Sequence, residues 1–299
     1  MPLQFLQYDV FTRDAFTGNQ LAVFLDAGGL EAARMQAIAR EMNFSESTFI
    51  MPAEQPGTDA RMRIFTPGLE LPMAGHPTIG STFALAHTGV IASGTARFVF
   101  GLGVGPTPVD LEWDGPRLHF AWMTQRLPEF GPVVEGRAPV AEALGLSTAD
   151  LDPLRPIQQV SCGVPFLLVP LRDAAAVDRA VSDAGAIRRL AVPVDHGIFL
   201  FALSPPGDSE TVYSRMFAPQ FGIAEDAATG SASGPLGAYL VQHGVVAAGT
   251  AARAIVSLQG VAMGRPSRIH IAIDGTPEAI TGVRVGGAAV LVARGELLA

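Results

Sequence analysis

Residues 74–80 read Ala-Gly-His-Pro-Thr-Ile-Gly, and the rest of the chain can be read outward from them. Proline is well tolerated at the first position of a helix, so Pro77 predicts a helix start with His76 as its N-cap residue. The backbone N–H groups at such a start lack partners within the helix and attract anions. Gly75 has no Cβ to keep a ligand away, and the His76 imidazole can exchange a proton near neutral pH. We therefore predict half of a carboxylate-binding site here.

A second copy of this stretch lies 155 residues further along the chain. That shift aligns Gly75 with Gly230, and it aligns His76 with Ser231, itself a good N-cap residue. Two more segments match upstream in the same order: residues 63–67 match 215–219 at a shift of 152, and residues 18–23 resemble 163–168. Chance could supply one such match in a chain rich in Gly and Ala, but an ordered series indicates a duplicated unit.

The length and the helix pattern together predict the architecture. A chain of 299 residues accommodates two domains of about 150 residues each. Each predicted start is followed by a helix that is apolar nearly all round and therefore buried, in a chain otherwise rich in short strands. We predict an α+β fold of two pseudo-symmetric domains, each a β-barrel-like sheet around a central apolar helix. Proline and glycine cluster between residues 125 and 140, which predicts domains at 1–125 and 126–299 with the active site in the cleft between them.

Composition excludes several classes of function. The net charge of −8 and the pI near 5.2 argue against nucleic acid or an anionic membrane as a partner. All 20 basic residues are arginine, so no lysine is present to form a Schiff base or a pyridoxal-phosphate aldimine. Cys162 is the only cysteine, which excludes a two-thiol racemase and a cysteine-rich metal site. We expect neither a metal ion nor a cofactor.

Two further features bear on cofactor and location. Residues 101–105, Gly-Leu-Gly-Val-Gly, resemble a dinucleotide-binding loop, but such a loop must open a helix, and Pro106 and Pro108 follow at once. The pattern predicts a hairpin and no nicotinamide cofactor. The first residues lack the basic start and apolar core of a signal peptide, and no apolar run reaches the roughly 18 residues that a membrane span needs. We expect a cytoplasmic protein.

Glu46 is the clearest candidate for a proton-transferring residue. Residues 44–51 are typical of a strand, and a period of two places Glu46 on the same face as Phe44, Thr48 and Ile50. Partial desolvation there would raise the carboxyl pKa toward the range useful for moving protons. The second copy places Ile198 at the equivalent position, so one copy carries the carboxylate and the other lacks it. Exposure of Glu46 to water at a strand edge explains this segment alone equally well.

Asp226 lies five residues before Ser231, on the loop that enters the second predicted helix. Helix capping alone would account for both residues when they are considered by themselves. The duplication favours a role in a site, because His76 and Ser231 then occupy equivalent places at two helix starts that could face one cleft.

Four motifs together resemble a known family over essentially the whole chain: Phe-Thr-Gly-Asn at 16–19, Asn-Phe-Ser-Glu-Ser-Thr-Phe at 43–49, the stretch at 74–80, and Glu-Asp-Ala-Ala-Thr-Gly-Ser-Ala at 225–232. The chain resembles the PhzF-like isomerases of phenazine biosynthesis, which are relatives of diaminopimelate epimerase. The family usually has proline where this chain has Ala227, a departure that concerns loop stiffness more than chemistry.

The resemblance implies the diaminopimelate epimerase-like fold and, commonly, a homodimer. It implies that Glu46 matches the proton-shuttling glutamate of the family, and that His76, Asp226 and Ser231 match its other polar site residues. Ser45 and Thr229 lie in the matching motifs, and we expect them to contribute to substrate binding. The reaction of the characterised type is a cofactor-free isomerisation of a dihydro-hydroxyanthranilate.

We therefore expect an isomerase that moves a proton within a small carboxylate-bearing substrate. The helix starts at Gly75 and Gly230 would bind the carboxylate, and Glu46 would act as base and then as acid. Two alternatives stay open. One is a non-catalytic protein that binds a small acid or a partner chain. The other is an amino-acid racemase or epimerase, which needs a second acid–base group, for which His76 and Asp226 are the visible candidates.

Overall fold

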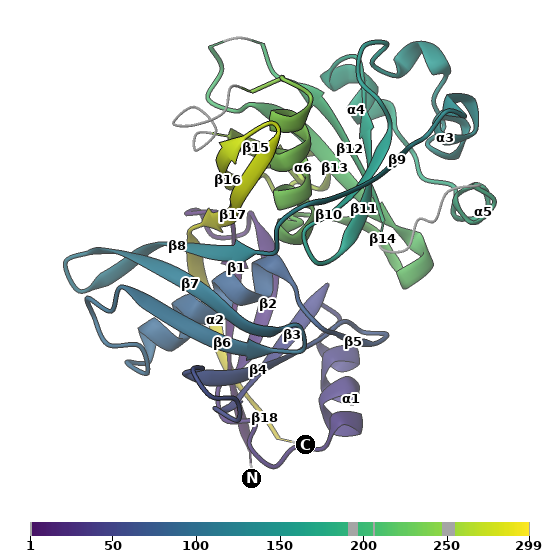
Figure 1. Cartoon of the computed structure of the whole chain (residues 1–299). Coiled ribbons are helices and arrows are strands. Elements are labelled where there is room, and N and C mark those ends of the chain that lie inside the picture. The colour runs from purple at the N-terminus through teal and green to yellow at the C-terminus, as the bar shows by residue number, and fades with distance from the viewer. Residues whose placement is uncertain (1, 191–196, 206, 247–254, 299) are drawn as a thin grey trace. The chain divides into compact units, whose positions relative to one another are not determined.

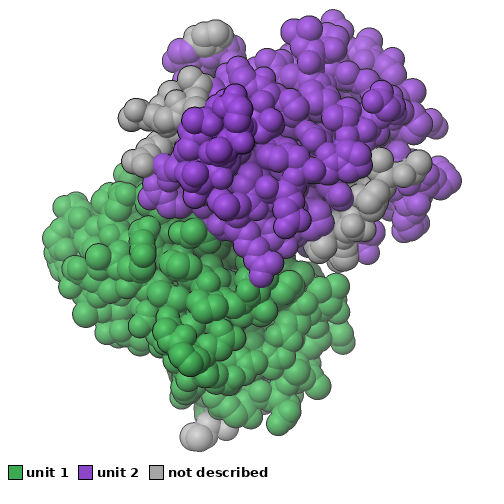
Figure 2. All heavy atoms as spheres, in the orientation of Figure 1, with its two compact units in different colours: residues 1–124, 285–299 green, residues 125–284 purple. Residues whose placement is uncertain are grey.

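The computed structural model describes residues 2–190, 197–205, 207–246 and 255–298. The chain forms two compact units (Figure 2): unit 1 comprises Met1–Thr124 and Val285–Ala299, and unit 2 comprises Gln125–Arg284. The break between residues 124 and 125 lies one residue before the predicted domain boundary, and the predicted second domain extended to residue 299. The last strand, β18 (Ala289–Leu297), instead pairs antiparallel with β1 (Leu3–Val10), and this pairing places the C-terminal residues in unit 1.

Unit 1 is a mixed sheet in which most neighbouring strands are antiparallel. Two pairs are parallel, β2 with β3 and β4 with β6. The remaining strands of the unit, beyond β1 and β18, are β2 (Asn19–Phe24), β3 (Glu46–Pro52), β4 (Ala60–Phe65), β5 (Glu70–Leu71), β6 (Arg97–Leu102), β7 (Gly105–Asp114) and β8 (Arg117–Gln125). The glycine-rich residues 101–105 join β6 to β7 as a hairpin, as predicted.

The helix α2 (Gly75–His87) is the buried element of unit 1 (Figure 1). Every residue from Gly75 to Leu85 is buried, because the helix is apolar all round and packs against β1, β2, β3 and β18. Gly80 permits this close packing, since a Cβ there would lie 2.6 Å from the Leu21 side chain. A second helix, α1 (Ala32–Met42), buries Met35 and Ile38 against phenylalanines of β2, β3 and β4.

Unit 2 repeats this plan. Its parallel pairs are β11 with β12 and β13 with β15. Its strands are β9 (Glu129–Val133), β10 (Gln158–Ser161), β11 (Pro165–Pro170), β12 (Ile198–Leu203), β13 (Val212–Ala218), β14 (Ile223–Asp226), β15 (Ile255–Gln259) and β16 (Ser267–Thr276), while β17 (Ala279–Gly287) runs to the junction of the units. The central helix α6 (Gly230–Gln242) is buried against β10, β11 and β16.

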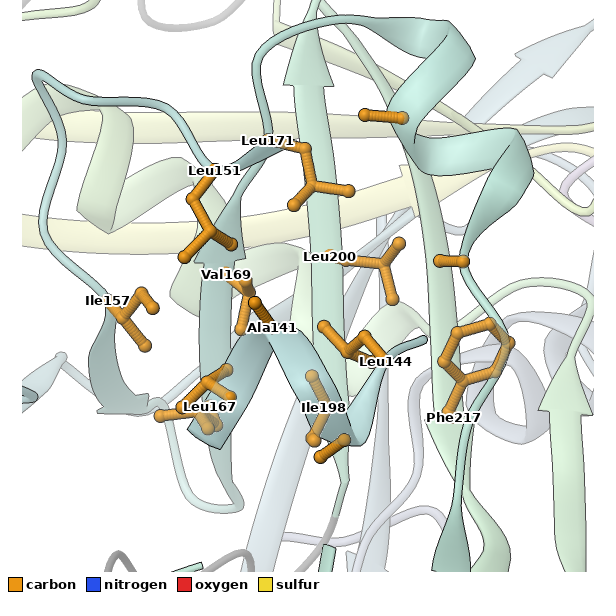
Figure 3. Packing of buried hydrophobic residues seen from close by; sticks show 14 of the residues in the cluster. Ala141, Leu144, Leu151, Ile157, Leu167, Val169, Leu171, Ile198, Leu200 and Phe217 are labelled. Carbon is orange, nitrogen blue, oxygen red and sulfur yellow. The ribbon is translucent and has the colours of Figure 1, made fainter. Parts of the chain in front are cut away.

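Three short helices lie outside the sheet of unit 2: α3 (Arg137–Ala143), α4 (Ala174–Arg179) and α5 (Ala184–Arg188). Leu144, just after α3, packs against Leu200 of β12 and other apolar side chains of β11, β12 and β13 (Figure 3). Unit 2 therefore has a hydrophobic layer outside its sheet, in addition to the one around α6.

The duplication extends to individual contacts. The helices α2 and α6 have 13 residues each and begin 155 residues apart. In unit 1, Arg63 binds Glu70 through two hydrogen bonds of 2.7 and 2.6 Å. In unit 2, Arg215 binds Glu225 through two of 2.8 and 2.7 Å. Each glutamate lies five residues before the first residue of its central helix, so both helix starts are approached by a loop with the same ion pair.

In the described part of the chain, no helix has the length and apolar character needed to cross a bilayer.

Candidate active site

The polar residues of unit 1 meet at the start of α2. Glu46 is the first residue of β3 and lies beside Leu21 of β2, whereas His76 is the second residue of α2. The two side chains are 8% and 3% exposed, and Glu46 Oε2 lies 3.3 Å from His76 Nε2. Glu46 is therefore buried rather than exposed to water at a strand edge, and the structure brings together two of the four predicted catalytic residues.

Both central helices begin two residues earlier than proline and serine placement suggested. The N-cap residue of α2 is Ala74 rather than His76, and that of α6 is Thr229 rather than Ser231. Proline is accepted at the third helical position for the same reason as at the first, because N–H groups in the first turn have no partner within the helix. Neither N-cap side chain bonds to its helix. No side-chain cap therefore occupies the first-turn N–H groups at either start, and anion binding at Gly75 and Gly230 stays a prediction.

His76 is neutral at ordinary pH. Burial lowers the pKa of its imidazole to about 3, and a backbone hydrogen bond with Gln20 acts weakly in the opposite direction. A neutral imidazole has one nitrogen that donates and one that accepts, so its neighbours determine where the proton lies.

Asn19 sets the tautomer of His76. Ser45 Oγ donates to Asn19 Oδ1 at 2.9 Å, and in this orientation the NH₂ group of the Asn19 amide lies toward His76. Asn19 Nδ2 then faces His76 Nδ1 at 3.2 Å and must donate to it. The imidazole proton therefore lies on Nε2, the nitrogen next to Glu46. The donors thus follow one another from Ser45 to Asn19 to His76, whose Nε2 lies 3.3 Å from Glu46 Oε2.

Asp226, Thr229, Gly230 and Ser231 lie together in unit 2. Asp226, 6% exposed, is the last residue of β14, and Gly230 and Ser231 open α6. Thr229 Oγ1 donates to Asp226 Oδ2 at 2.6 Å. A hydroxyl has a single proton, and the hydroxyls of Thr229 and Ser45 both donate theirs to other protein groups. If these residues bind substrate, as predicted, they do so through their oxygen lone pairs or their backbone groups.

The sequence did not reveal the contacts of two buried amides. Asn19 lies in a motif but had no predicted role, and Gln259, which binds Thr229 and Asp226, was not among the predicted site residues. An asparagine after Gly18 does signal a turn. Gln259 has no local signal, because it lies 33 residues from Asp226 and meets it only through the sheet.

Strand pairing in the two units corrects the residue that was predicted to correspond to Glu46 in the second copy. In unit 1, Arg63 lies opposite Phe49, and in unit 2, Arg215 lies opposite Leu200. Glu46 precedes Phe49 by three residues, so its counterpart is Gly197 rather than Ile198. The prediction was wrong by one residue because the connection from β12 to β13 is one residue longer than that from β3 to β4.

Gly197 has no room for a side chain. Its φ is 147°, and a Cβ there would lie 3.0 Å from the Phe217 carbonyl oxygen. The second copy therefore has no acid–base group at the position of Glu46.

Two other features limit the chemistry. The Cys162 thiol is buried, and burial together with the nearby Glu129 raises its pKa to about 12, so it stays protonated. Across the described ranges, no group of three or more His, Cys, Asp and Glu side chains is arranged to hold a metal ion.

Comparison with solved structures identifies the fold. A hydroxyproline epimerase from Agrobacterium vitis has the same fold, with a TM-score of 0.70 at 13% identity over 99% of this chain and 92% of that one. The chain thus shares the α+β fold of that protein, which confirms the predicted fold.

Sequence comparison identifies the family. The profile of the family described as phenazine biosynthesis-like protein, PhzC-PhzF, matches residues 8–295, and the chain belongs to this family. It is 38% identical over 292 residues to a trans-2,3-dihydro-3-hydroxyanthranilate isomerase of Pseudomonas fluorescens, covering 97% of each chain. A PhzF-family phenazine biosynthesis protein of Bacillus anthracis has a TM-score of 0.86 at 26% identity over 100% of both chains. The protein is an isomerase.

Proposed function

We propose that this isomerase moves a proton within a small carboxylate-bearing substrate of the dihydro-hydroxyanthranilate type, without a cofactor. Glu46 takes the proton from carbon and returns it at another position of the same framework. His76, Asp226 and Ser231 hold the framework or protonate it. The name of the Pseudomonas fluorescens relative supports this class of substrate.

One observation carries the proposal: a buried carboxylate lies 3.3 Å from a neutral imidazole in one copy, and a glycine stands at the equivalent position in the other. Inversion of a stereocentre requires an acid–base group on each face of the carbon. A proton shift along one face requires a single group that gives back what it takes. Glu46 without a counterpart fits the second reaction and disfavours racemisation.

The uncapped helix starts supply the carboxylate-binding groups. At α2, the N–H groups of Gly75 and His76 lie in the first turn, and at α6 those of Gly230 and Ser231 do so. We propose that residues of both units act on the same substrate molecule. The partial positive charge of a helix start stabilises a carboxylate and any negative charge that develops beside it.

The test replaces the carboxylate by its amide. Glu46→Gln keeps the size and burial of the side chain, so we expect turnover of trans-2,3-dihydro-3-hydroxyanthranilate to fall about 10²–10⁴-fold while the substrate still binds. Glu54→Gln makes the same change at an exposed glutamate beyond the end of β3 and should leave turnover intact. Full activity of the Glu46→Gln enzyme would refute the assignment.

Solvent exchange separates the proton shift from racemisation. In D₂O, NMR of this substrate and of a panel of cyclic amino and hydroxy acids shows where deuterium enters. A moved double bond, with the optical configuration retained elsewhere, supports the proposal. Deuterium at a stereocentre with loss of optical rotation would instead assign a racemase.

A further inference from the structure

The loop between β14 and α6 is held by one fully buried side chain, that of Gln259, which is 0% exposed. Its Nε2 donates to the Asp226 carbonyl oxygen at 2.8 Å and to Thr229 Oγ1 at 2.9 Å, while its Oε1 accepts from Thr229 N at 3.0 Å. The orientation of the amide is unambiguous. A flipped amide would set oxygen against a carbonyl oxygen and NH₂ against an N–H.

These contacts determine where the Thr229 proton points. The hydroxyl accepts from Gln259 Nε2, so its own proton is available for Asp226 Oδ2 at 2.6 Å. We infer that Gln259 is a positioning residue for Asp226: it directs the Thr229 hydroxyl proton to that carboxylate and holds the carboxylate as a hydrogen-bond acceptor in one orientation. This inference rests on the proposed role of Asp226 in the isomerase site.

Comparison with unit 1 shows that the fold does not require this amide. The two parallel pairs correspond, with Ala60 beside Phe100 in unit 1 and Val212 beside Ser257 in unit 2. Two residues further along β6 and β15 stand Leu102 and Gln259. Leu102 is buried as well, but its side chain forms no hydrogen bonds. The same place in the repeat is therefore filled by a hydrocarbon where no carboxylate needs orienting.

The close approach of strand and loop is also independent of the amide. A Cβ on Gly260 would lie 2.5 Å from the Ala227 carbonyl oxygen, and one on Gly103 would lie 2.9 Å from Pro72 Cα. Both units thus bring a glycine at the end of the strand against the loop before the central helix. What unit 2 adds is the hydrogen-bonded series of Gln259, Thr229 and Asp226.

The chain provides a matched pair of variants. Gln259→Leu gives unit 2 the residue that unit 1 has. Gln158→Leu removes another hydrogen-bonded buried amide of unit 2, which binds the Gly131 carbonyl oxygen and His243 near the far end of α6. Both variants lose comparable hydrogen bonds, so a general loss of stability affects both alike.

The first measurement does not need a substrate. Carbon-13 NMR of the full chain, with aspartate labelled at Cγ and the Asp226 signal assigned through Asp226→Asn, follows protonation of this carboxylate. A carboxylate that loses a donated hydrogen bond is protonated more readily. We expect the midpoint for Asp226 to rise by about one pH unit in Gln259→Leu, a tenfold change in proton affinity. Thr229→Val should do the same, whereas Thr229→Ser and Gln158→Leu should leave the midpoint unchanged. An unchanged midpoint in Gln259→Leu would overturn the inference.

The second measurement is kinetic. With trans-2,3-dihydro-3-hydroxyanthranilate, kcat of Gln259→Leu should fall up to about 100-fold with little change in KM, and the acid limb of its pH profile should move to higher pH. Gln158→Leu should keep the wild-type profile. If the wild-type protein shows no turnover or exchange while the NMR shift is present, the proposed function fails and the positioning role stands. A parallel loss in both variants, without the shift in pH profile, would reduce Gln259 to a structural residue.

Discussion

At the scale of single residues, each predicted acidic group depends on a buried amide. Asn19 orients His76 beside Glu46, and Gln259 orients Thr229 beside Asp226. An amide suits this task because it donates and accepts at fixed positions without carrying charge.

Reversal of the amide at residue 19 should reverse the tautomer of His76. In Asn19→Asp, a carboxylate oxygen faces Nδ1 and requires a proton there, so Nε2, which lies 3.3 Å from Glu46 Oε2, no longer carries the imidazole proton. We expect the ¹⁵N shifts of the His76 ring to change to the Nδ1–H pattern and turnover to fall about 100-fold or more. Asn19→Leu removes the donor without imposing a tautomer and should give a mixed pattern. An Asn19→Asp protein that kept the Nε2–H pattern and normal turnover would contradict the assignment.

The neutrality of His76 should be visible in stability. Its folded-state pKa is lowered from 6.5 to about 3, so between these values the unfolded chain binds a proton that the folded protein excludes. The contribution of His76 is complete above pH 6.5 and is lost as pH falls, by up to about 1.4 kcal/mol per pH unit. In His76→Gln, the free energy of unfolding should therefore depend less steeply on pH in this window. Urea unfolding at pH 4, 5, 6 and 7.5 measures the difference, and coincident slopes below pH 6.5 would refute it.

At the scale of elements, neither central helix has a side-chain hydrogen bond at its N-cap. An alanine N-cap is among the least favourable, and the threonine N-cap of α6 turns its hydroxyl to Asp226 instead of to the helix. Each helix forgoes about 1 kcal/mol of capping energy. Burial of apolar surface on all sides of α2 and α6 compensates, which is why a poorly capped helix persists at each site.

A capping side chain introduced at the start of α2 should stabilise the protein and weaken substrate binding. In Ala74→Ser, the new hydroxyl can accept from the His76 N–H, because the next residue, Pro77, has no N–H to offer. We expect about 1 kcal/mol of added stability and a KM raised about tenfold, since one anion-binding donor is taken. Glu31→Asp is the matched control, as it introduces a capping side chain at the exposed start of α1. It should stabilise the protein and leave KM unchanged, whereas an equal rise of KM in both variants would count against a binding role for the α2 start.

At the scale of the whole molecule, the two units share one pattern of strand pairing but carry different polar side chains. Both copies have the same parallel pairs, the same arginine–glutamate pair before the central helix, and central helices of equal length. The polar residues differ: Glu46 of unit 1 corresponds to Gly197 in unit 2, and Gln259 of unit 2 corresponds to Leu102 in unit 1. The two copies thus share a helix start of the same kind, and they differ in the polar side chains around it.

The discontinuous first unit makes a specific prediction. Removal of residues 285–299 takes β18 away from β1 along the whole register from Leu3–Leu297 to Val10–Ala289 and removes a strand on which α2 packs. Hydrogen exchange of the truncated chain should therefore show lost protection in β1 and α2. Peptides from α6 and from β10 to β13 should stay protected and act as the internal control. Loss confined to unit 2 would favour the continuous boundary at residue 126.

Most of the elements could be predicted because their causes are local. Glycine and proline mark the turns, an apolar surface all round marks α2 and α6, and a period of two marks strands such as β3. The helix starts were misplaced by two residues, since proline fits anywhere in the first turn. The strand register was off by one at Gly197, since sequence alone does not reveal a single extra residue in a connection.

The sequence by itself determined that this protein is two copies of one unit, that each copy contains a buried helix, and that one copy alone carries Glu46. Only the tertiary structure decided which strand closes unit 1, which tautomer His76 adopts, and that Gln259 binds the loop before α6. The physical reason is distance along the chain: helix signals act within a few residues, whereas β18 pairing and both buried amides join residues that only the folded sheet brings together.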